Sequence, residues 1–321
     1  MNNENVKFWY DTHYYEGKKV TFPKKDLKIA GLLFLPENFD STKKYPAIVV
    51  THPGGGVKEQ VASMYAWNMS KKGYVTLAFD ASYQGESEGE PRYIEDPYSR
   101  VEDIRSAIDY LVTLDYVDED KIGAMGICAG GGYTMSAIQT EYRIKAAAGV
   151  SSWNIGKSMR EGNPNALSND AMKNNLTAIA AQRTKEAKGE TPLYVGVVPN
   201  SPDEFEAFGN STIMKEGYEY YRTPRCQYPT SVNKMRFAYL DNVVSFDAFQ
   251  YIDTVAPRPI LLIVGSIADT AYFSEDGYER AKAPKELFKI DGATHFDLYD
   301  KPEYVSQAVA KLTEFFGKNL K

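Results

Sequence analysis

The stretch IGAMGICAG (residues 122–130) decides the fold class of this chain. An apolar run leads directly into Cys128, which has glycines two positions before and after it, and the helix-type segment YTMSAIQT (residues 133–140) follows. In a G-x-S-x-G elbow a strand turns sharply into a helix, and glycines at these positions let the backbone close without Cβ clashes. The pattern predicts a strand–nucleophile–helix unit with Cys128 at its apex. The alternative is a small structural cysteine in a Rossmann-like glycine turn, although the G-x-G-x-x-G fingerprint is not matched.

Five further apolar runs surround this unit along the chain. They are AIVVT (47–51), VTLAF (75–79), AAAGV (146–150), ILLIV (260–264) and ELFKI (286–290). Such runs are typical of strands buried on both faces, and segments of helical spacing lie between the runs up to residue 150 and after the last. The segment KVTFPKKDLKIAGLLFLP (19–36) instead alternates around a Lys-Asp turn, as an antiparallel hairpin does. We therefore expect the α/β class, with a mostly parallel central sheet, helices on both faces and an N-terminal antiparallel hairpin.

The alternation of strands and helices stops between Ser151 and Pro257. Roughly a hundred residues intervene there, far more than an ordinary connection between a strand and a helix. The interval holds a polar helical segment, DAMKNNLTAIAAQRTKEAKGE (170–190), and an aromatic-rich one, EGYEYYRTPRCQYP (216–229). We predict that residues 1–150 and 258–321 form the core and that residues 151–257 form an inserted cap over the carboxyl edge of the sheet, where ligands of open α/β sheets bind.

Composition and charge limit the classes of partner. The 321 residues carry a net charge of −6 with a pI near 5.3, and Lys and Arg form no block longer than a pair. This argues against nucleic acid and anionic membranes and favours a small-molecule substrate. The N-terminus lacks the apolar core of an export signal and no apolar run approaches ~18 residues, so we expect a cytoplasmic protein. The two cysteines lie far apart in the sequence and are expected to be free thiols. No Cys/His cluster indicates a metal site, and we expect no cofactor. The sequence leaves open whether the protein forms a homo-oligomer.

A nucleophile at an elbow needs a base, and the chain has only three histidines. His13 lies in a polar N-terminal segment and is most simply a surface residue. His52 ends an apolar run and opens the sequence HPGGG, where we expect it to shape the turn. His295, in DGATHFDLYD just after the last predicted strand, lies at the carboxyl edge of the sheet. We therefore expect His295 to be the base.

An acid that orients the histidine is expected in a loop after an earlier strand. Asp269, in GSIADTAYFSED, follows the run ILLIV within a few residues, with Glu275 and Asp276 as neighbouring alternatives. The other interpretation of Asp269 is a helix cap. For the oxyanion hole, the glycines of HPGGG allow backbone amides to approach a substrate oxygen, and we assign the amides of Gly54 and Ala129.

The position of Cys128 at a helix N-terminus predicts its reactivity. Unpaired amides and the helix dipole stabilise a thiolate, so we expect a thiol pKa below that of an ordinary cysteine, and faster alkylation than at Cys226. The resulting reaction is attack of Cys128 on an acyl carbon, with the thiol deprotonated in advance by His295 or during substrate binding.

Five segments of the chain together resemble the α/β-hydrolase superfamily, specifically its dienelactone hydrolase-like branch and the bacterial YcjY-like hydrolases within that branch. The segments are VVTHPGGGVKEQ, FDASYQGESEG, KIGAMGICAGGGY, GSIADT and GATHFDLYD. The resemblance covers about residues 18 to 318 apart from the insertion. It implies an α/β-hydrolase fold, a triad of Cys128, His295 and Asp269, and acyl-transfer chemistry on carboxylic esters or lactones. No segment of this chain can be matched to the additional acid and the arginines that bind the carboxylated lactone in dienelactone hydrolase itself.

The function that we expect from the sequence is therefore hydrolysis of esters, lactones or thioesters through an acyl-enzyme. Acyl transfer by the same residues and a catalytically silent binding protein are the alternatives. In the insertion and its surroundings, Trp153, Tyr83, Tyr218 and Tyr221 are candidates for an apolar pocket with polar tips, against ordinary packing of the cap.

Overall fold

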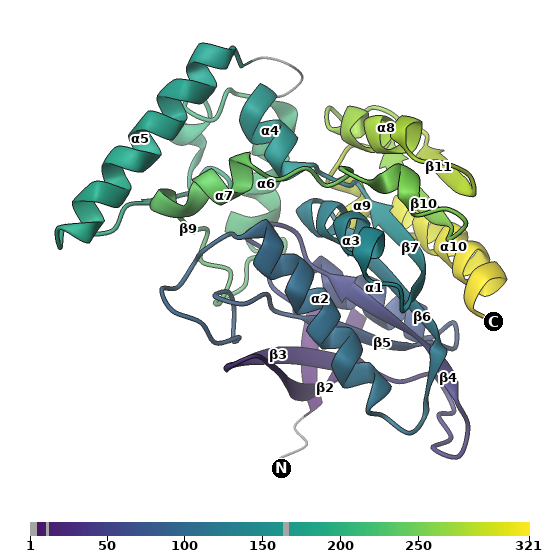
Figure 1. The fold of residues 1–321 in the computed structure, drawn as a ribbon. Helices are drawn as coiled ribbons and strands as arrows, with labels where there is room; N and C mark the ends of the chain where they lie inside the picture. The colour runs from purple at the N-terminus through teal and green to yellow at the C-terminus, as the bar shows by residue number, and fades with distance from the viewer. Residues whose placement is uncertain (1–4, 11–12, 163–166) are drawn as a thin grey trace.

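The computed structural model describes residues 5–10, 13–162 and 167–321 (Figure 1). Their main sheet has nine strands in the order β1-β2-β3-β5-β4-β6-β7-β10-β11. The strands are β1 (Asn5–Tyr10), β2 (His13–Lys24), β3 (Leu27–Phe34), β4 (Tyr45–Thr51), β5 (Val75–Phe79), β6 (Val117–Ile127), β7 (Ile144–Val150), β10 (Ile260–Gly265) and β11 (Lys285–Ile290). Each of the six predicted apolar runs lies in a strand of this sheet.

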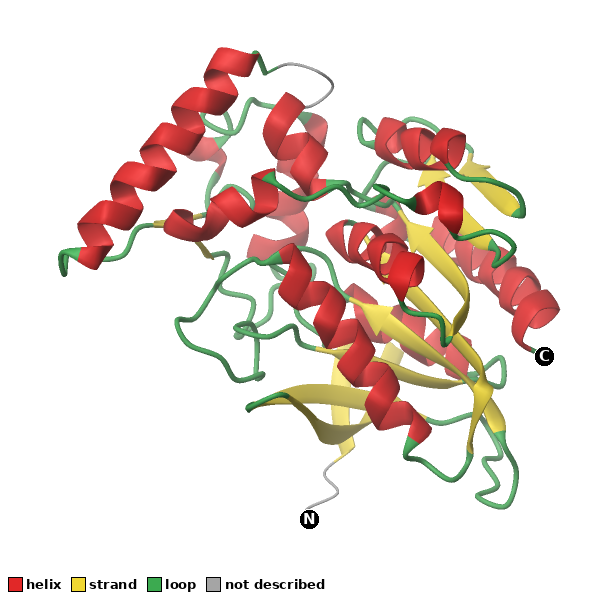
Figure 2. Ribbon diagram, viewed as in Figure 1, coloured by secondary structure: helices red, strands yellow, loops and turns green. Residues whose placement is uncertain are grey.

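Strand direction follows the sequence pattern. From β5 to β11 every neighbouring pair is parallel, whereas β1, β2 and β3 form an antiparallel meander whose last strand joins β5. The turn between β2 and β3 consists of Lys25 and Asp26, as predicted for the N-terminal hairpin. The predicted fold class, an α/β-hydrolase fold with a mostly parallel sheet and an antiparallel N-terminal hairpin, is confirmed (Figure 2).

Helices cover both faces of the sheet. They are α1 (Val61–Ser70), α2 (Pro97–Val112), α3 (Ala129–Thr140), α8 (Ala271–Arg280), α9 (Asp297–Asp300) and α10 (Pro302–Leu320). In β4, Ile48 and Val50 pack with α1 and α10 in one hydrophobic cluster, while Ala47 and Val49 pack with α2 and α3 in another. Successive strand side chains point to opposite faces, so this double burial explains why the runs are continuously apolar.

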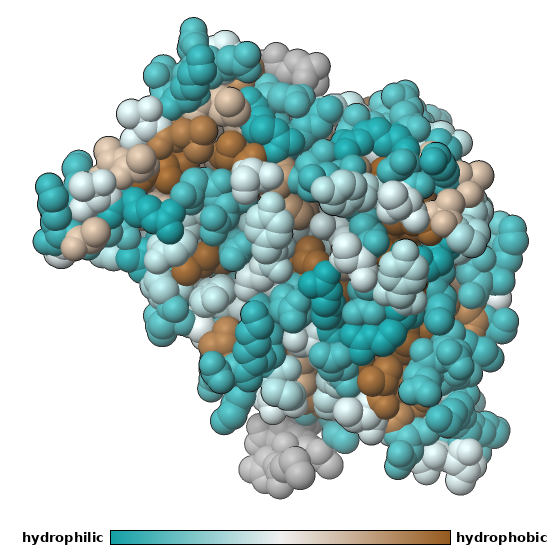
Figure 3. All heavy atoms as spheres, in the orientation of Figure 1, coloured by the Kyte–Doolittle hydropathy of each residue, from teal (hydrophilic) through white to brown (hydrophobic). Residues whose placement is uncertain are grey.

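The long insertion folds into its own elements at one end of the sheet. They are α4 (Ile155–Glu161), α5 (Asn169–Ala187), β8 (Tyr194–Val195), α6 (Thr212–Arg222), β9 (Met235–Arg236) and α7 (Leu240–Val244). Helix α5 stands apart from the body of the molecule, and Ile179 is its one buried residue (Figure 1). Apolar side chains are visible along α5 on an otherwise mostly hydrophilic face (Figure 3). None of the helices among the described residues is long and apolar enough to cross a membrane.

The last part of the insertion returns to the core. Phe246, Phe249 and Ile252 are buried in the same cluster as α2 and α3. Gln139 of α3 donates from Nε2 to the Ala248 carbonyl at 2.8 Å and accepts from the Tyr251 amide at 2.8 Å. The part of the insertion that stands apart from the core therefore ends near α7, and the residues after it belong to the layer of helices on the sheet.

Candidate active site

The chain makes a sharp elbow at Cys128, between the last residue of β6 and the first residue of α3. Cys128 has φ 57° and ψ −125°, a conformation that L-residues rarely adopt outside constrained sites. A Cβ on Gly126 would collide with the carbonyl oxygen of Gly130, and a Cβ on Gly130 would collide with that of Thr51. Both flanking glycines are therefore needed, as the elbow pattern predicts, and Cys128 occupies the position of a displayed nucleophile.

Two backbone amides converge on the Cys128 sulfur. They belong to Gly54, in the loop after β4, and to Ala129, the first residue of α3. A Cβ on Gly54 would lie 3.6 Å from the Cβ of Ala129, so the two backbones are neighbours. Paired amides beside a nucleophile are the geometry that receives the oxyanion of a tetrahedral intermediate. These are the two amides that the sequence assigned to the oxyanion hole.

The thiol of Cys128 is nevertheless a weak acid. Burial raises its pKa to about 11, although the hydroxyl of Tyr299 and the two amides act in the opposite direction. The sequence predicted a lowered pKa from the helix N-terminus alone, and that prediction is wrong. Its physical reason is that an apolar environment disfavours the charged thiolate by more than the amides favour it.

His295 lies across from the elbow, in the loop after β11, and is 1% exposed. Its Nδ1 is 2.6 Å from Thr270 Oγ1, and its Nε2 is 3.3 Å from the Tyr299 hydroxyl. Its ring also contacts Trp153, with 5.7 Å between ring centroids. Burial lowers the pKa of His295 to about 3, so the imidazole is neutral at physiological pH. The structure thus holds an uncharged thiol and an uncharged imidazole in one site.

Asp269, the predicted acid of the triad, has no hydrogen bond to His295 in the described part of the structure. Its Oδ2 accepts a hydrogen bond of 3.3 Å from the Ile213 amide in the first turn of α6, so it contacts a helix of the insertion and does not cap α8, the helix that follows it. Burial raises the pKa of Asp269 above the ordinary value. The contact to His295 Nδ1 comes instead from Thr270, the residue before α8. In the structure Thr270, and not the predicted Asp269, is therefore the residue that contacts His295 Nδ1.

The two neighbouring acids are also engaged elsewhere. Glu275 pairs with Lys289 at 2.6 Å, and Asp276 pairs with Arg280 at 3.4 Å. The low pKa of His295 agrees with the absence of a carboxylate partner: burial lowers this pKa, and no nearby carboxylate acts to raise it.

Tyr299 is a site residue that the sequence reasoning missed. It is fully buried, and its hydroxyl contacts both His295 Nε2 and the Cys128 thiol. The sequence feature that could have identified Tyr299 is its position four residues after His295. This spacing brings two side chains together when the intervening residues form a helical turn. Helix α9 provides that turn, but four residues with only one apolar position give no helical periodicity to recognise.

His52 has the structural role that the sequence predicted. Its Nδ1 lies 2.7 Å from the Pro53 carbonyl, and its Nε2 lies 3.0 Å from the Ala81 amide and 2.9 Å from Arg100 Nη1. Burial and the charge of Arg100 hold its pKa well below the ordinary value. Both ring nitrogens are therefore engaged in shaping the loop that carries Gly54. The side chain of His13 lies outside the described part of the structure.

Two of the four predicted pocket residues lie beside Cys128 and His295. Trp153 contacts the His295 ring, and its amide donates to the Cys128 carbonyl at 2.8 Å. Tyr221 of α6 is buried and lies near enough to Cys128 for a thiolate there to raise its pKa further. The other two lie elsewhere: Tyr83 packs against Gly89, and Tyr218 packs against Phe205 with 5.6 Å between ring centroids. Trp153 and Tyr221 are therefore the two predicted pocket residues that the structure places beside Cys128 and His295.

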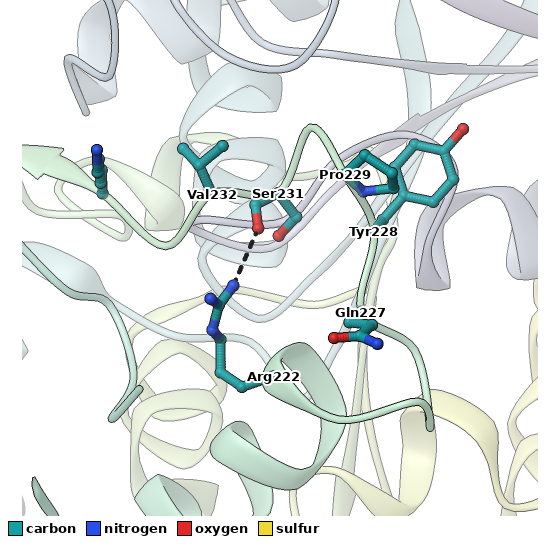
Figure 4. Close-up of a pocket in the computed structure, with 7 residues that line it drawn as sticks. Arg222, Gln227, Tyr228, Pro229, Ser231 and Val232 are labelled. Atoms are coloured by element: carbon teal, nitrogen blue, oxygen red, sulfur yellow. Dashed lines mark hydrogen bonds between the residues drawn. The ribbon is translucent and has the colours of Figure 1, made fainter. Parts of the chain in front are cut away.

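A cavity of about 640 Å³ lies in the cap beside the loop that carries Gly54 (Figure 4). The Ser231 hydroxyl on its wall donates to the Gly55 carbonyl at 2.9 Å, and the Arg222 guanidinium lies 3.4 Å from the Ser231 carbonyl. The volume is in the range of small-molecule sites. The residues that line it are Arg222, Gln227, Tyr228, Pro229, Ser231, Val232 and Lys234.

The fold also brings together three carboxylates that the sequence did not predict to meet. Those of Glu59, Asp80 and Glu86 lie within 4.8 Å of one another. The Lys58 ammonium sits among them, at 2.6 Å from Glu59, 2.8 Å from Asp80 and 2.7 Å from Glu86. Asp80 and Glu59 raise the pKa of Lys58 against the effect of burial, and burial raises the pKa of Glu59 to about 7. Lys58 therefore supplies the positive charge of this cluster and ties the loop after β4 to the end of β5.

Comparison with known proteins agrees with this fold. Residues 29–183 match the dienelactone hydrolase family. The chain is 41% identical over 307 residues to the protein YcjY of Escherichia coli (strain K12), an alignment covering 94% of this chain and 99% of YcjY. The crystal structure of the hypothetical protein PA2218 from Pseudomonas aeruginosa matches with a TM-score of 0.90 and 34% identity over 100% of both chains. The acyltransferase drtE of Aspergillus calidoustus is 24% identical over 307 residues, covering 94% of this chain and 96% of drtE. The chain belongs to the dienelactone hydrolase family and is an α/β-hydrolase enzyme.

Proposed function

We propose that the enzyme hydrolyses carboxylic esters, lactones or thioesters through an acyl-enzyme on Cys128. The observation that carries this proposal is the convergence of the Gly54 and Ala129 amides on a sulfur held at a strained elbow. That arrangement positions the nucleophile and the oxyanion donors on the same side of an incoming acyl carbon. His295 acts as the base, and Thr270 orients it in place of a carboxylate.

Acylation starts from the neutral pair. With Thr270 Oγ1 accepting from Nδ1–H, the Nε2 of His295 carries a lone pair and can take up the proton that leaves Cys128. The sulfur attacks the acyl carbon, and the resulting oxyanion is held by the two amides. His295 then returns the proton to the leaving group, and a thioester remains on Cys128. Attack by water on that thioester, with His295 again as base, releases the acid and restores the thiol.

The chemistry of the nucleophile selects the class of substrate. A thiolate leaves a tetrahedral intermediate more readily than an alkoxide or an amide anion does, so unactivated amides mostly return to starting material. Enol lactones, enol or aryl esters and thioesters have leaving groups that compete with sulfur. The cap cavity and the side chains of Trp153 and Tyr221 are the candidates for holding the rest of such a substrate.

Acyl transfer is the second candidate, because the relative drtE is an acyltransferase. The same steps apply to transfer when an alcohol or thiol instead of water attacks the thioester. The near-complete burial of His295 favours transfer to the extent that it keeps water from the acyl-enzyme.

The test is a p-nitrophenyl acetate assay combined with mass spectrometry of the intact enzyme. We expect a burst of p-nitrophenol, a mass increase of one acetyl group on the peptide that holds Cys128, and no burst from Cys128→Ala. Steady turnover without an added acceptor identifies a hydrolase, whereas turnover that requires an alcohol or thiol acceptor identifies a transferase. Cys226→Ala is the matched control and should behave as the wild type. A fully active Cys128→Ala enzyme would contradict the proposal.

A further inference from the structure

The hydroxyl of Tyr299 lies between the two groups that the proposed mechanism pairs. It is 3.3 Å from His295 Nε2 and is hydrogen-bonded to the thiol of Cys128. In a Ser-His-Asp triad this nitrogen contacts the nucleophile directly. In this chain the phenol oxygen makes contact with the nitrogen on one side and with the sulfur on the other.

Packing holds Tyr299 in this place. Its ring is fully buried and contacts Phe296 and Tyr220, with 4.4 and 5.0 Å between ring centroids. The carbonyl of the preceding residue, Leu298, accepts a hydrogen bond of 2.8 Å from the Tyr65 hydroxyl. The ring of Tyr299 is therefore held by Tyr220 of α6 and by Phe296, whereas the Tyr65 hydrogen bond reaches only the backbone of the preceding residue. A hydroxyl on a ring held in this way has a fixed place in the site, as a group that takes part in chemistry needs.

A phenol suits this position because it donates one hydrogen bond and accepts others. The groups that face Tyr299 are Cys128, His295, Tyr220 and Tyr221, and none of them carries a charge in the resting site. Burial holds the pKa of Tyr299 well above its ordinary value, so the group stays a neutral phenol. Its hydroxyl lowers the pKa of the Cys128 thiol when it donates to the sulfur, and when it donates to His295 Nε2 instead, its oxygen is free to accept the S–H proton.

We propose that Tyr299 relays the proton from Cys128 to His295 during acylation, an inference that rests on the proposed function. The S–H bond breaks as its proton joins the Tyr299 oxygen, and the phenolic proton leaves that oxygen for Nε2. The sulfur electron pair forms the bond to the acyl carbon, and the carbonyl π pair moves to the oxygen held by the two amides. The step ends with an imidazolium, a neutral phenol and an oxyanion, so protons and charge balance.

The test compares Tyr299→Phe with Tyr65→Phe. Both variants remove one buried hydroxyl and keep the ring, and the two tyrosines are neighbours through Leu298. We expect Tyr299→Phe to slow the pre-steady-state acylation by p-nitrophenyl acetate by about 10²- to 10⁴-fold, the usual effect of losing a group that transfers a proton. Tyr65→Phe should acylate near the wild-type rate, because its hydroxyl bonds a backbone carbonyl away from the reacting atoms.

A proton inventory separates a relay from a structural role. In mixtures of water and deuterium oxide the wild-type acylation rate should follow a curved dependence on deuterium fraction, because two protons move in one step. The remaining rate of Tyr299→Phe should follow a straight line. A merely structural tyrosine would lower the rate and leave the curvature unchanged.

Three outcomes decide between the proposals. Wild-type acylation by folded Tyr299→Phe, or a slowed variant with unchanged curvature, would overturn the relay. Activity retained by Cys128→Ala would instead overturn the proposed function and leave nothing for Tyr299 to relay. If Tyr299→Phe fails to fold, 3-fluorotyrosine is incorporated at position 299 instead. The fluorinated phenol has a lower pKa than tyrosine, so the acylation rate and the pH profile of that rate should change. An unchanged pH profile would refute the relay.

Discussion

Alkylation of Cys128 in the free enzyme should show a neutral thiol up to strongly alkaline pH. With the thiol pKa at about 11 and that of His295 at about 3, moving the proton between them costs on the order of 11 kcal/mol before the two charges attract each other. Opposite charges about 4 Å apart regain about 4 kcal/mol in a protein environment. The difference of roughly 7 kcal/mol leaves about one molecule in 10⁵ as the thiolate–imidazolium pair. The resting site is therefore a thiol beside an imidazole.

The magnitude of the effect on alkylation follows from the same pKa. At pH 7 a thiol of pKa about 11 is ionised in about one molecule in 10⁴, against about one in 30 for an ordinary cysteine. The more basic thiolate is intrinsically more nucleophilic, which raises the alkylation rate of each thiolate by about 15-fold. Cys128 should consequently react with iodoacetamide about 20-fold more slowly than a free cysteine at pH 7, and tenfold faster with each pH unit up to about pH 10.

The assay uses Cys226→Ser, which leaves Cys128 as the single thiol, with circular dichroism as a check of folding at each pH. Thiolate absorbance at 240 nm, measured against the Cys128→Ala,Cys226→Ser chain, gives an independent titration. A second run in denaturant supplies the rate of the same cysteine without the fold. A rate that reaches its plateau below about pH 8, or an absorbance change centred there, would show a preformed thiolate and refute the neutral pair.

Three substitutions test the surroundings of the site. Thr270→Asp places a carboxylate against His295 Nδ1, which favours the imidazolium and should raise the pKa of His295. The acid limb of the kcat/KM profile should therefore move up by about 1–3 pH units, and an unmoved limb would contradict the Thr270 contact. Asp269→Asn should leave kcat/KM near the wild-type value, whereas loss of a true triad acid costs about 10⁴-fold, so a loss of that size would restore Asp269 to the triad. Lys58→Met leaves Asp80 and Glu59 buried without their cation and should lower the free energy of unfolding at pH 7 by about 3–5 kcal/mol, measured by urea denaturation. That loss should shrink as the pH falls and the Glu59 carboxylate, whose pKa burial raises to about 7, becomes protonated, and a loss independent of pH would contradict the charge argument.

The parts of the fold that depend on local pattern could be predicted from the sequence. In β4, neighbouring side chains enter different hydrophobic clusters on the two faces of the sheet, and that double burial is what makes the strand continuously apolar. The elbow at Cys128 was predictable because its glycines are required by backbone collisions within a few residues and with one adjacent loop. His295 was proposed as the base by elimination among three histidines, which needed only the order of the strands, and the structure places it near the elbow through their shared contact with Tyr299.

The errors concern choices between neighbouring residues and sums of opposing effects. Asp269 and Thr270 are adjacent, and which of them faces His295 depends on where α8 begins and on α6 lying near enough to engage the Asp269 carboxylate. The thiol pKa of Cys128 is the balance of burial against two amides and a hydroxyl, and burial is a property of the whole fold. Tyr299 escaped notice because it enters the site from a helical turn too short to leave a periodic pattern.

The absence of charge in the resting site and the use of Thr270 instead of a carboxylate have a common physical basis. A carboxylate against His295 would stabilise the imidazolium before any substrate arrives, and the buried site would then hold a charge that its apolar walls disfavour. A hydroxyl orients the ring without adding that charge. In the mechanism that we propose, the imidazolium forms only when an oxyanion forms beside the Gly54 and Ala129 amides, so each new charge has an opposite partner at the moment it appears. The same reasoning favours cysteine over serine as the proposed nucleophile: a thiol of pKa about 11 is still far easier to deprotonate in such surroundings than a serine hydroxyl, so a neutral imidazole suffices as its base.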